Sequence, residues 1–424
     1  MAGDTLRILV IEDEDTVRDL VRTVLERAGY EVLTAPDGQA GYELAQKERL
    51  DLVVSDLLTP RMHGYEVLQR LKATPSTRRL PVIVLSAKAY PADQRKALEM
   101  GAAAFLAKPF RPPALLAVVS RVLDTLRVRF WGVRGSIATP GPETVRYGGN
   151  TPCVTVERGR DLLILDAGTG LRPLGVALQA GAGGRPLDIK MLITHTHWDH
   201  IQGFPFFVPA FVPGNRLEIH GPPSLDKPLE KVLRGQMDPE YFPVSLGDMA
   251  ADIHVEEVRE PHFTAGAFQV HAIYVNHPGV TMAYRVTCGD TSVVYATDTE
   301  PYRRLLPGAN GEDSVATEYA TGRDGQLIDF VRDTDLYIAD SQYTPEDYLT
   351  KRGWGHTCYP DVVDIALKAN AARVALFSHD PMHDDDAIDR KLAHCRKLAE
   401  GTALEVIPAI EGEAIELIKE VIVG

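Results

Sequence analysis

The sequence predicts two folded parts: a five-stranded parallel α/β sheet over the first 126 residues, and an α+β sandwich over the rest. The first prediction rests on continuous apolar runs that alternate with segments of helical periodicity, because such strands are typical of parallel sheets covered on both faces. The second rests on short strands separated by turns rich in Gly and Pro, with fewer helical segments.

The predicted strands of the first part end in polar side chains. The run at residues 8–11 is followed by apolar residues at helical spacing through residue 25, and further runs occupy residues 52–54, 82–85 and 104–106. In parallel α/β sheets, functional groups collect at the carboxyl ends of the strands. The side chains expected together at this edge are Glu12, Asp13, Asp56, Ser86 and Lys108.

The boundary between the two parts is predicted near residue 126. Pro112-Pro113 opens a last helix that runs to about this position, and a strand at residues 128–131 follows almost at once. We therefore expect domains at residues 1–126 and 127–424, with little or no flexible linker.

Composition favours a globular, non-membrane protein. Of the 424 residues, 45% are hydrophobic and 25% are charged, which is ordinary for a soluble domain. No apolar run reaches the roughly 18 residues that span a bilayer, and the N-terminus turns acidic too soon for a secretory signal. The four cysteines show no CxxC spacing, so reduced thiols and a cytoplasmic location are expected.

The net charge of −14 is unevenly placed. Residues 1–126 hold equal numbers of basic and acidic side chains, so the excess acid falls on the second part. This argues against a surface that tracks the phosphates of long nucleic acid. A small anionic substrate stays compatible, because bound divalent cations reverse the local field.

The strand-end groups of the first part suit phosphoryl transfer. Carboxylates hold Mg²⁺, a carboxylate beside that ion can accept a phosphoryl group, and a hydroxyl and an ammonium can bind its oxygens. The segments ILVIED (8–13), DLLTPRMHG (56–64), LSAK (85–88) and KPF (108–110) resemble the receiver domain of response regulators, over residues 5–125.

This resemblance implies a flavodoxin-like sheet and a phosphodonor such as a sensor histidine kinase. It implies Asp56 as the phosphoacceptor, and Mg²⁺ held by Glu12, Asp13 and Asp56. It further implies a switch hydroxyl, a switch lysine and a switch aromatic ring, which are Ser86, Lys108 and Phe105.

The second part contains a dense cluster of metal-ligand side chains. The strand-like residues 191–194 run directly into HTHWDH at residues 195–200. Imidazoles and carboxylates are common ligands of Zn²⁺ and other transition ions. Alternate residues of such a loop point to one side, and a helical turn that follows points the last two residues in another direction. One loop can therefore supply ligands to two metal ions. The ligand types are His195, His197, Asp199 and His200.

Three further ligand types follow other apolar runs of the second part. His277 follows residues 272–275, Asp298 follows residues 293–296, and His379 follows residues 374–377. A single residue of this kind commonly lies at the surface or makes a structural hydrogen bond. Together with the HTHWDH cluster, the three residues provide enough ligands for a site that holds two metal ions. His383 is a rival to His379 for the last ligand.

HTHWDH matches the HxHxDH motif of the metallo-β-lactamase fold hydrolases, and the resemblance covers residues 128–424. It implies an αββα sandwich and two divalent ions, zinc in the first place and manganese or iron as alternatives. One ion is implied at His195, His197 and His277, and the other at Asp199, His200 and His379, with Asp298 bridging. Two such ions activate a water nucleophile and neutralise the developing anion.

Within that superfamily the chain resembles phosphodiesterases of the ribonuclease Z type. The Gly-rich opening at residues 130–154 is similar, and Gly355-His356-Thr357 resembles an extra histidine motif that assists at the scissile phosphate. This implies His356 as a general acid or hydrogen-bond donor, with helix capping as the alternative. Arg134 and Arg146 are candidate phosphate contacts, or else structural. The long basic arm used by that group to grip transfer RNA is not seen.

The leading interpretation is a response regulator whose output is a metal-dependent phosphodiesterase, controlled through Asp56. The substrate is expected to be a small phosphodiester such as a cyclic nucleotide, with short RNA next, and Asp199 is expected to orient the attacking water. The alternatives are a thioester or lactone hydrolase, a flavodiiron-type oxygen reductase, and a signalling module that binds metal without turnover. Whether the chain forms a homodimer stays open.

Overall fold

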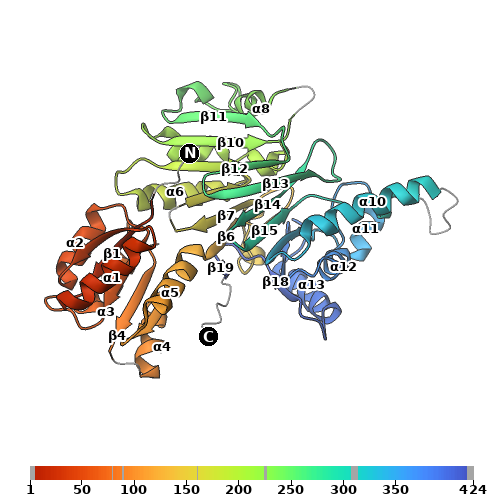
Figure 1. The fold of residues 1–424 in the computed structure, drawn as a ribbon. Helices are drawn as coiled ribbons and strands as arrows, with labels where there is room; N and C mark the ends of the chain where they lie inside the picture. The colour runs from red at the N-terminus through yellow and green to blue at the C-terminus, as the bar shows by residue number, and fades with distance from the viewer. Residues whose placement is uncertain are drawn as a thin grey trace.

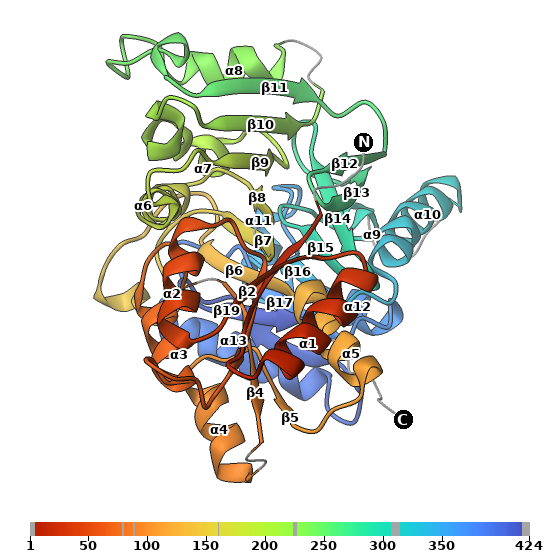
Figure 2. The same cartoon turned by 60° about the vertical axis from the view of Figure 1, so that its left-hand side comes forward.

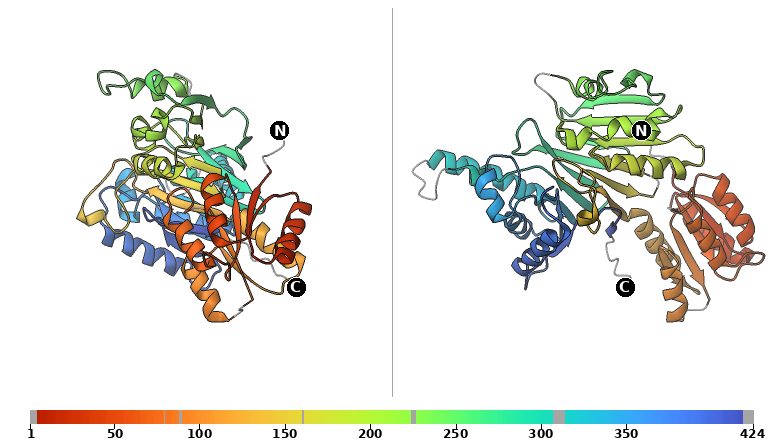
Figure 3. Two further views of the ribbon diagram at one scale, coloured as in Figure 1. Left: turned by 90° about the vertical axis from the view of Figure 1, so that its left-hand side faces the viewer. Right: turned by 180° about the vertical axis from the view of Figure 1, so that it is seen from behind.

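The computed structural model describes residues 5–78, 80–87, 90–159, 161–223, 227–306 and 314–417 (Figure 1). Three β-sheets organise these residues, one of five strands and two of seven. The five-stranded sheet is built from the amino-terminal residues and lies beside the two larger sheets, which face each other (Figures 1 and 3).

The five-stranded sheet is entirely parallel, as the continuous apolar runs predicted. Its strand order is β2-β1-β3-β4-β5. The strands are β1 (Arg7–Ile11), β2 (Glu31–Ala35), β3 (Leu52–Asp56), β4 (Val82–Ser86) and β5 (Ala104–Ala107). The helices are α1 (Asp15–Arg27), α2 (Gly38–Lys47), α3 (Gly64–Ala73), α4 (Pro91–Glu99) and α5 (Pro112–Asp124).

Helices cover both faces of this sheet, which explains why its strands carry no polar alternation. Helices α1 and α5 pack together on one face, while α2, α3 and α4 cover the other (Figure 2). Local signals set the helix starts: the Asp37 carboxylate accepts the Ala40 amide at 2.9 Å to cap α2, and proline occupies the first turn of α5.

The two seven-stranded sheets are mixed. The first has the order β11-β10-β9-β8-β7-β6-β19 and the second β12-β13-β14-β15-β16-β17-β18. The strands of the first are β6 (Leu126–Gly132), β7 (Cys153–Arg158), β8 (Asp161–Leu165), β9 (Asp188–Leu192), β10 (Arg216–Gly221), β11 (Asp252–Glu257) and β19 (Ala414–Leu417). Those of the second are β12 (His262–Ala265), β13 (Phe268–Tyr274), β14 (Met282–Cys288), β15 (Thr291–Ala296), β16 (Leu336–Asp340), β17 (Arg373–Phe377) and β18 (Glu405–Pro408).

A shared apolar core joins the two sheets face to face. It draws on both, with Phe130 and Val156 from one sheet and Tyr284, Tyr295 and Phe377 from the other. Helices cover the two outer faces and complete an αββα sandwich. The helices described in this part are α6 (Leu171–Ala182), α7 (Trp198–Ile201), α8 (Leu229–Gly235), α9 (Tyr302–Leu305), α10 (Ser314–Val331), α11 (Pro345–Lys351), α12 (Tyr359–Lys368) and α13 (Asp385–Leu398).

The connection between the five-stranded sheet and the sandwich is a single residue, Thr125, between α5 and β6. Arg158 of β7 reinforces it, since its guanidinium donates to the Leu123 carbonyl at 3.2 Å and to the Asp124 carboxylate at 2.5 Å. Helix α5 is therefore joined to β6 without a flexible linker. No helix among the described residues is long and apolar enough to cross a membrane.

Candidate metal centre

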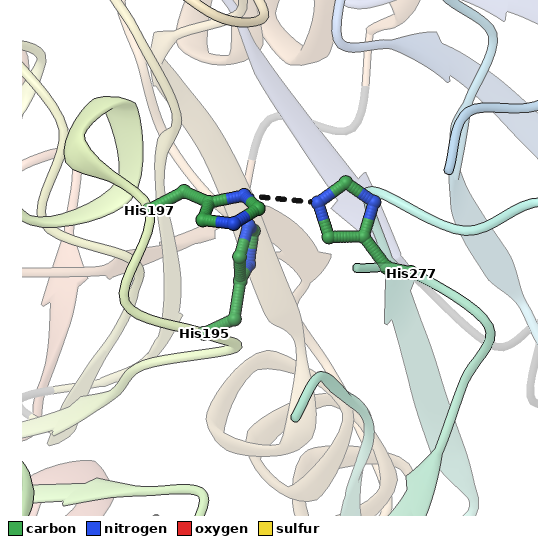
Figure 4. Close-up of side chains that lie close together, drawn as sticks. All are labelled: His195, His197 and His277. Atoms are coloured by element: carbon green, nitrogen blue, oxygen red, sulfur yellow. Dashed lines mark hydrogen bonds between the residues drawn. The ribbon is translucent and has the colours of Figure 1, made fainter. Parts of the chain in front are cut away.

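His195 and His197, on the loop after β9, meet His277, which follows β13. Figure 4 shows the three imidazoles converging, with His277 facing the other two from a separate strand. One ring nitrogen of each lies within 4.8 Å of the others, and His277 Nε2 is 3.0 Å from His197 Nδ1. The structure thus brings together three residues that the sequence separates by about 80 positions.

Asp298, at the end of β15, lies against this group and extends it. Its Oδ2 atom is 3.2 Å from His200 Nε2, 3.6 Å from His195 Nε2 and 3.8 Å from His277 Nε2. On the other side, Asp199 Oδ2 is 3.3 Å from His200 Nε2. Asp298 is therefore the carboxylate shared by the imidazoles of both halves of the cluster.

His356 joins the same centre from the loop after α11. Its ring lies 5.2 Å from that of His277, and one of its nitrogens is within 4.8 Å of His277 and Asp298 ligand atoms. His356 Nδ1 donates to Asp340 Oδ2 at 3.0 Å. Burial alone would lower the pKa of His356, but the charges of Asp340 and Asp298 outweigh it and raise that pKa to about 9.

His379 is not brought into the compact cluster. None of the described groups of three ligand atoms within 4.8 Å includes it. Its Nε2–H donates to the Ala409 carbonyl at 3.0 Å, which leaves Nδ1 buried without a hydrogen-bond partner among the described residues. The rival His383 points elsewhere, with Nε2 3.1 Å from Asp347 Oδ2. The assignment of His379 as a ligand stays a prediction.

Asp166, which follows β8, orients His200 and was missed in the sequence. Its Oδ2 atom accepts from His200 Nδ1 at 2.8 Å and from the Tyr295 hydroxyl at 2.9 Å, while Oδ1 accepts the Thr194 amide at 2.7 Å. Because Nδ1 of His200 donates, its Nε2 lone pair is turned toward Asp298. The sequence did contain an indication of this residue, because Asp166 follows the apolar run 162–165 just as Asp298 follows the apolar run 293–296.

Glu300 orients His277 through a loop, and no sequence signal marked it. Its buried carboxylate accepts the Gly353 amide at 3.0 Å and the Gly355 amide at 2.9 Å, and it also accepts the Tyr348 hydroxyl. The Gly355 carbonyl in turn accepts Nδ1–H of His277 at 2.8 Å. This fixes the His277 tautomer with its Nε2 lone pair facing His197 and Asp298.

The backbone is strained where these side chains leave their strands. Asp166, Asp298 and Ser378 have φ values of 61°, 49° and 56°, in the left-handed region that non-glycine residues seldom adopt. Such strain costs on the order of 1–3 kcal/mol per residue and clusters at functional sites. All three residues follow strands of the sandwich, two of them supplying carboxylates to the cluster.

The donor set fits divalent transition ions. It combines imidazole nitrogens with carboxylate oxygens, which Zn²⁺, Mn²⁺ and iron accept. The buried Nε2 atoms of His195 and His200 have no hydrogen-bond partner in the described part of the chain. Buried polar atoms are normally paired, so nitrogens left unpaired beside a carboxylate are suited to hold a cation. Burial also lowers the pKa of His195, which keeps its lone pair available.

The two arginines considered as phosphate contacts both have partners within the protein. For the buried Arg134 this corrects the phosphate assignment in favour of the structural alternative, while for the half-exposed Arg146 the phosphate contact stays a prediction. The Arg134 side chain is 0% exposed and donates to the carbonyls of Gly148, Asp380 and His383. Arg146 pairs with Asp386 and Asp389 of α13. Arg134 thus connects the Gly-rich segment at residues 130–154 to the loop after His379, and the ion pairs of Arg146 connect the same segment to α13.

The five-stranded sheet gathers the predicted acidic set at the carboxyl ends of its strands. Ligand atoms of Glu12, Asp13 and Asp56 lie within 4.8 Å of one another. Lys108 Nζ donates to Glu12 at 2.6 Å and to Asp56 at 2.9 Å. Ser86 ends the neighbouring strand β4, and the half-buried Phe105 packs on the core from β5. Lys88 of the LSAK segment lies outside the described residues.

Two family models match the chain in tandem. A response regulator receiver domain matches residues 8–120, and a beta-lactamase superfamily domain matches residues 162–379. Among curated proteins, the alkaline phosphatase synthesis regulatory protein PhoP of Bacillus subtilis is 35% identical over 137 residues, which is 32% of this chain and 52% of PhoP. The transcriptional regulator RpaA of Synechocystis is 37% identical over 140 residues, 33% of this chain and 58% of its own. The chain thus spans about half the length of these relatives.

Solved structures resemble each part separately. The metallo-beta-lactamase fold protein YhfI from Bacillus subtilis covers 69% of this chain and 100% of its own, at 20% identity and a TM-score of 0.45. A diphosphatase of the PhnP family covers 69% and 98%, at 18% identity and a TM-score of 0.46. The chemotaxis regulator CheY4 of Vibrio cholerae covers 28% and 99%, at 34% identity and a TM-score of 0.27.

The family matches agree with the parallel sheet, the αββα sandwich and the positions of the two polar clusters. The chain therefore belongs to the beta-lactamase superfamily and carries a response regulator receiver domain in front of its sandwich.

Proposed function

We propose that this chain is a response regulator whose output is a dinuclear-metal phosphodiesterase, acting on a small phosphodiester and controlled by phosphorylation of Asp56. We further propose a domain boundary near residue 126, with domains at residues 1–126 and 127–424. One observation carries the proposed activity: the imidazole cluster converges on Asp298, with His356 held beside it by its hydrogen bond to Asp340.

The cluster offers ligands for two divalent ions, zinc in the first place. His195, His197 and His277 would hold one ion, with Asp298 shared. The other would be held by Asp199 and His200, with His379 contributing its unpaired Nδ1. Bound cations supply a lowered pKa for a coordinated water molecule and charge neutralisation for the phosphate oxygens.

The remaining roles, which are orienting the water, transferring protons and orienting the ligands, are proposed for protein side chains. Asp199, whose Oδ2 accepts the Ser136 amide at 2.8 Å, orients the attacking water and accepts its proton. His356 would donate a proton to the departing alkoxide oxygen, and Asp340 orients that imidazole and raises its pKa. Asp166 and Glu300 hold His200 and His277 in the required tautomers.

A leaving alkoxide needs a proton more than a leaving thiolate does, because its conjugate acid is far weaker. An imidazole placed to donate a proton beside the cluster therefore favours phosphodiester cleavage over the thioester hydrolysis that the same metal motif also serves. The thioester activity is kept as an outcome of the test below rather than as a second proposal.

On the receiver side, Asp56 is proposed to accept a phosphoryl group from a histidine kinase, with Mg²⁺ held by Glu12, Asp13 and Asp56. Ser86, Lys108 and Phe105 would respond to that group. A change at β4, β5 and α5 would reach β6 through Thr125, and β7 through the bonds of Arg158 to Leu123 and Asp124. A cavity of about 610 Å³ between the two domains, lined by Leu50, Pro75, Leu178 and Arg185 among others, leaves room for such a shift.

The test is a screen of the full chain against cyclic mono- and dinucleotides, a bis-aryl phosphodiester and a thioester, with and without acetyl phosphate as phosphodonor. We expect a phosphodiester to be hydrolysed, and its rate to change with acetyl phosphate in the natural chain but not in Asp56→Asn. Hydrolysis of the thioester alone would replace the proposed activity. Equal rates and an equal oligomeric state under all conditions would remove the switch.

Glu300→Ala is expected to weaken metal binding without unfolding the sandwich. Removing the carboxylate leaves the Gly353 and Gly355 amides unpaired, so the loop that orients His277 loosens. Loss of an outer hydrogen-bonding partner typically lowers metal affinity about 10- to 100-fold. A competition titration with a chromophoric chelator measures this. Glu346→Ala, in the first turn of α11, is the matched control and should leave the affinity unchanged.

A further inference from the structure

Two of the three tryptophans of this chain are exposed, and each is next in sequence to a residue that contacts His277 of the metal centre. Trp131 is buried in the sandwich, whereas Trp198 is 72% exposed and Trp354 is 62% exposed. A single exposed apolar side chain needs no explanation. Two indoles, the largest apolar side chains, left in solvent beside one polar cluster form a surface suited to a ligand.

The two indoles come from backbone on opposite sides of one imidazole. Trp198 directly follows His197, whose Nδ1 is 3.0 Å from His277 Nε2. Trp354 directly precedes Gly355, whose carbonyl accepts Nδ1–H of the same His277 at 2.8 Å. The two nitrogens of an imidazole face different ways, so the segments that carry Trp198 and Trp354 contact His277 from its two nitrogen-bearing sides.

Both indoles are carried on firmly held backbone. Trp198 begins the short helix α7, in which the Gln202 amide donates to the Trp198 carbonyl at 2.7 Å. Trp354 stands between two glycines whose amides are both bound by the buried Glu300. Rigid aromatic side chains lose little conformational entropy when a ligand stacks on them.

The basic side chains next to Trp354 are already engaged. Lys351 Nζ pairs with Asp380 at 2.9 Å, and Arg352 donates to the Leu306 carbonyl at 2.5 Å. Another exposed apolar side chain, Ile137 at 60%, follows Ser136, the residue whose amide binds Asp199. The surroundings of the centre therefore favour flat apolar groups over additional phosphates.

We propose that Trp198 and Trp354 are specificity-determining residues that stack against the base of a nucleoside phosphodiester, while its phosphate lies at the metal centre. The proposal rests on the phosphodiesterase activity proposed above and narrows its substrate to diesters that carry a nucleobase. Stacking on aromatic side chains tolerates different bases, because every base has a π-face. The two tryptophans would thus select substrates that carry a nucleobase, without distinguishing one base from another.

The test compares two esters with the same leaving group, thymidine 5′-(p-nitrophenyl) phosphate and methyl p-nitrophenyl phosphate, on the full metal-loaded chain. In Trp198→Ala and Trp354→Ala we expect KM for the thymidine ester to rise about 5- to 50-fold. The KM for the methyl ester should stay within about twofold, since the methyl group has no ring to stack. The Trp→Phe variants should retain most of the selectivity. Tyr90→Ala removes an exposed aromatic ring of the receiver domain and is the control.

A binding measurement separates this proposal from the proposed activity. Thymidine 5′-monophosphate should quench the indole fluorescence of the natural chain, and the quenching should be lost in the double alanine variant, which keeps buried Trp131. If diester hydrolysis persists with an unchanged ratio of the two KM values, the stacking role is wrong. If neither ester is hydrolysed, the proposed activity fails, and quenching equal in both chains would then overturn the stacking role as well.

Discussion

Asp298→Ala is expected to abolish hydrolysis, lowering kcat/KM by at least about a thousandfold and reducing the bound metal. Its Oδ2 atom lies within 3.2–3.8 Å of three imidazole Nε2 atoms, so it links the two halves of the cluster. Losing several kcal/mol of charge stabilisation corresponds to this rate effect, at about 1.4 kcal/mol per tenfold. Metal content by elemental analysis and steady-state turnover measure the two effects.

Asp290→Ala is the matched control for this variant. Asp290 is an exposed aspartate in the turn before β15, at the opposite end of the strand from Asp298. It should leave both metal content and turnover unchanged. An Asp298→Ala chain that hydrolyses the phosphodiester at the natural rate without bound metal would contradict the proposed mechanism.

His356→Ala is expected to lower kcat about 10²- to 10⁴-fold while the metal content stays unchanged, because positioned general acids contribute rate effects of this size. The buried Asp340 that accepts His356 Nδ1–H has the geometry of a partner for a proton donor. Pre-steady-state and steady-state turnover of a phosphodiester, beside elemental analysis, measure the result.

His394→Ala controls for the loss of an imidazole, since His394 bonds the Tyr359 hydroxyl at 2.7 Å between α12 and α13. It should behave as the natural chain. A His356→Ala chain that loses metal in proportion to its activity would make His356 a ligand, since its ring lies within ligand distance of His277 and Asp298. An unchanged kcat would remove it from the reaction altogether.

One physical regularity allows the sequence to indicate which strand-end residues lie near one another. A buried parallel strand reads as an apolar run, and the first polar residue beyond it lies at the edge where neighbouring strands also end. Asp298 and His277 were found in this way. Asp166 and Asp340 also come at the ends of apolar runs. A single acidic residue in that position can have many roles, and the histidines that these two aspartates contact are evident only from the fold.

Two other kinds of residue could not be read from the sequence. Glu300 acts through main-chain amides more than 50 positions away, and hydrogen bonds to amides leave no side-chain pattern. Arg134 looks available for a phosphate in a Gly-rich segment, yet the carbonyls around it come from Asp380 and His383. His379 falls in the expected place after β17, but the bond of its Nε2 to Ala409 depends on packing.

The most direct test of the central claim is metal-dependent turnover by the full chain. The protein is stripped with a chelator, titrated with Zn²⁺, and assayed in parallel on a phosphodiester and on a thioester. The proposed site predicts that phosphodiester hydrolysis returns in step with occupancy and saturates at two ions per chain, with little thioester cleavage. A fully loaded chain that cleaves the thioester and leaves every phosphodiester intact would contradict it.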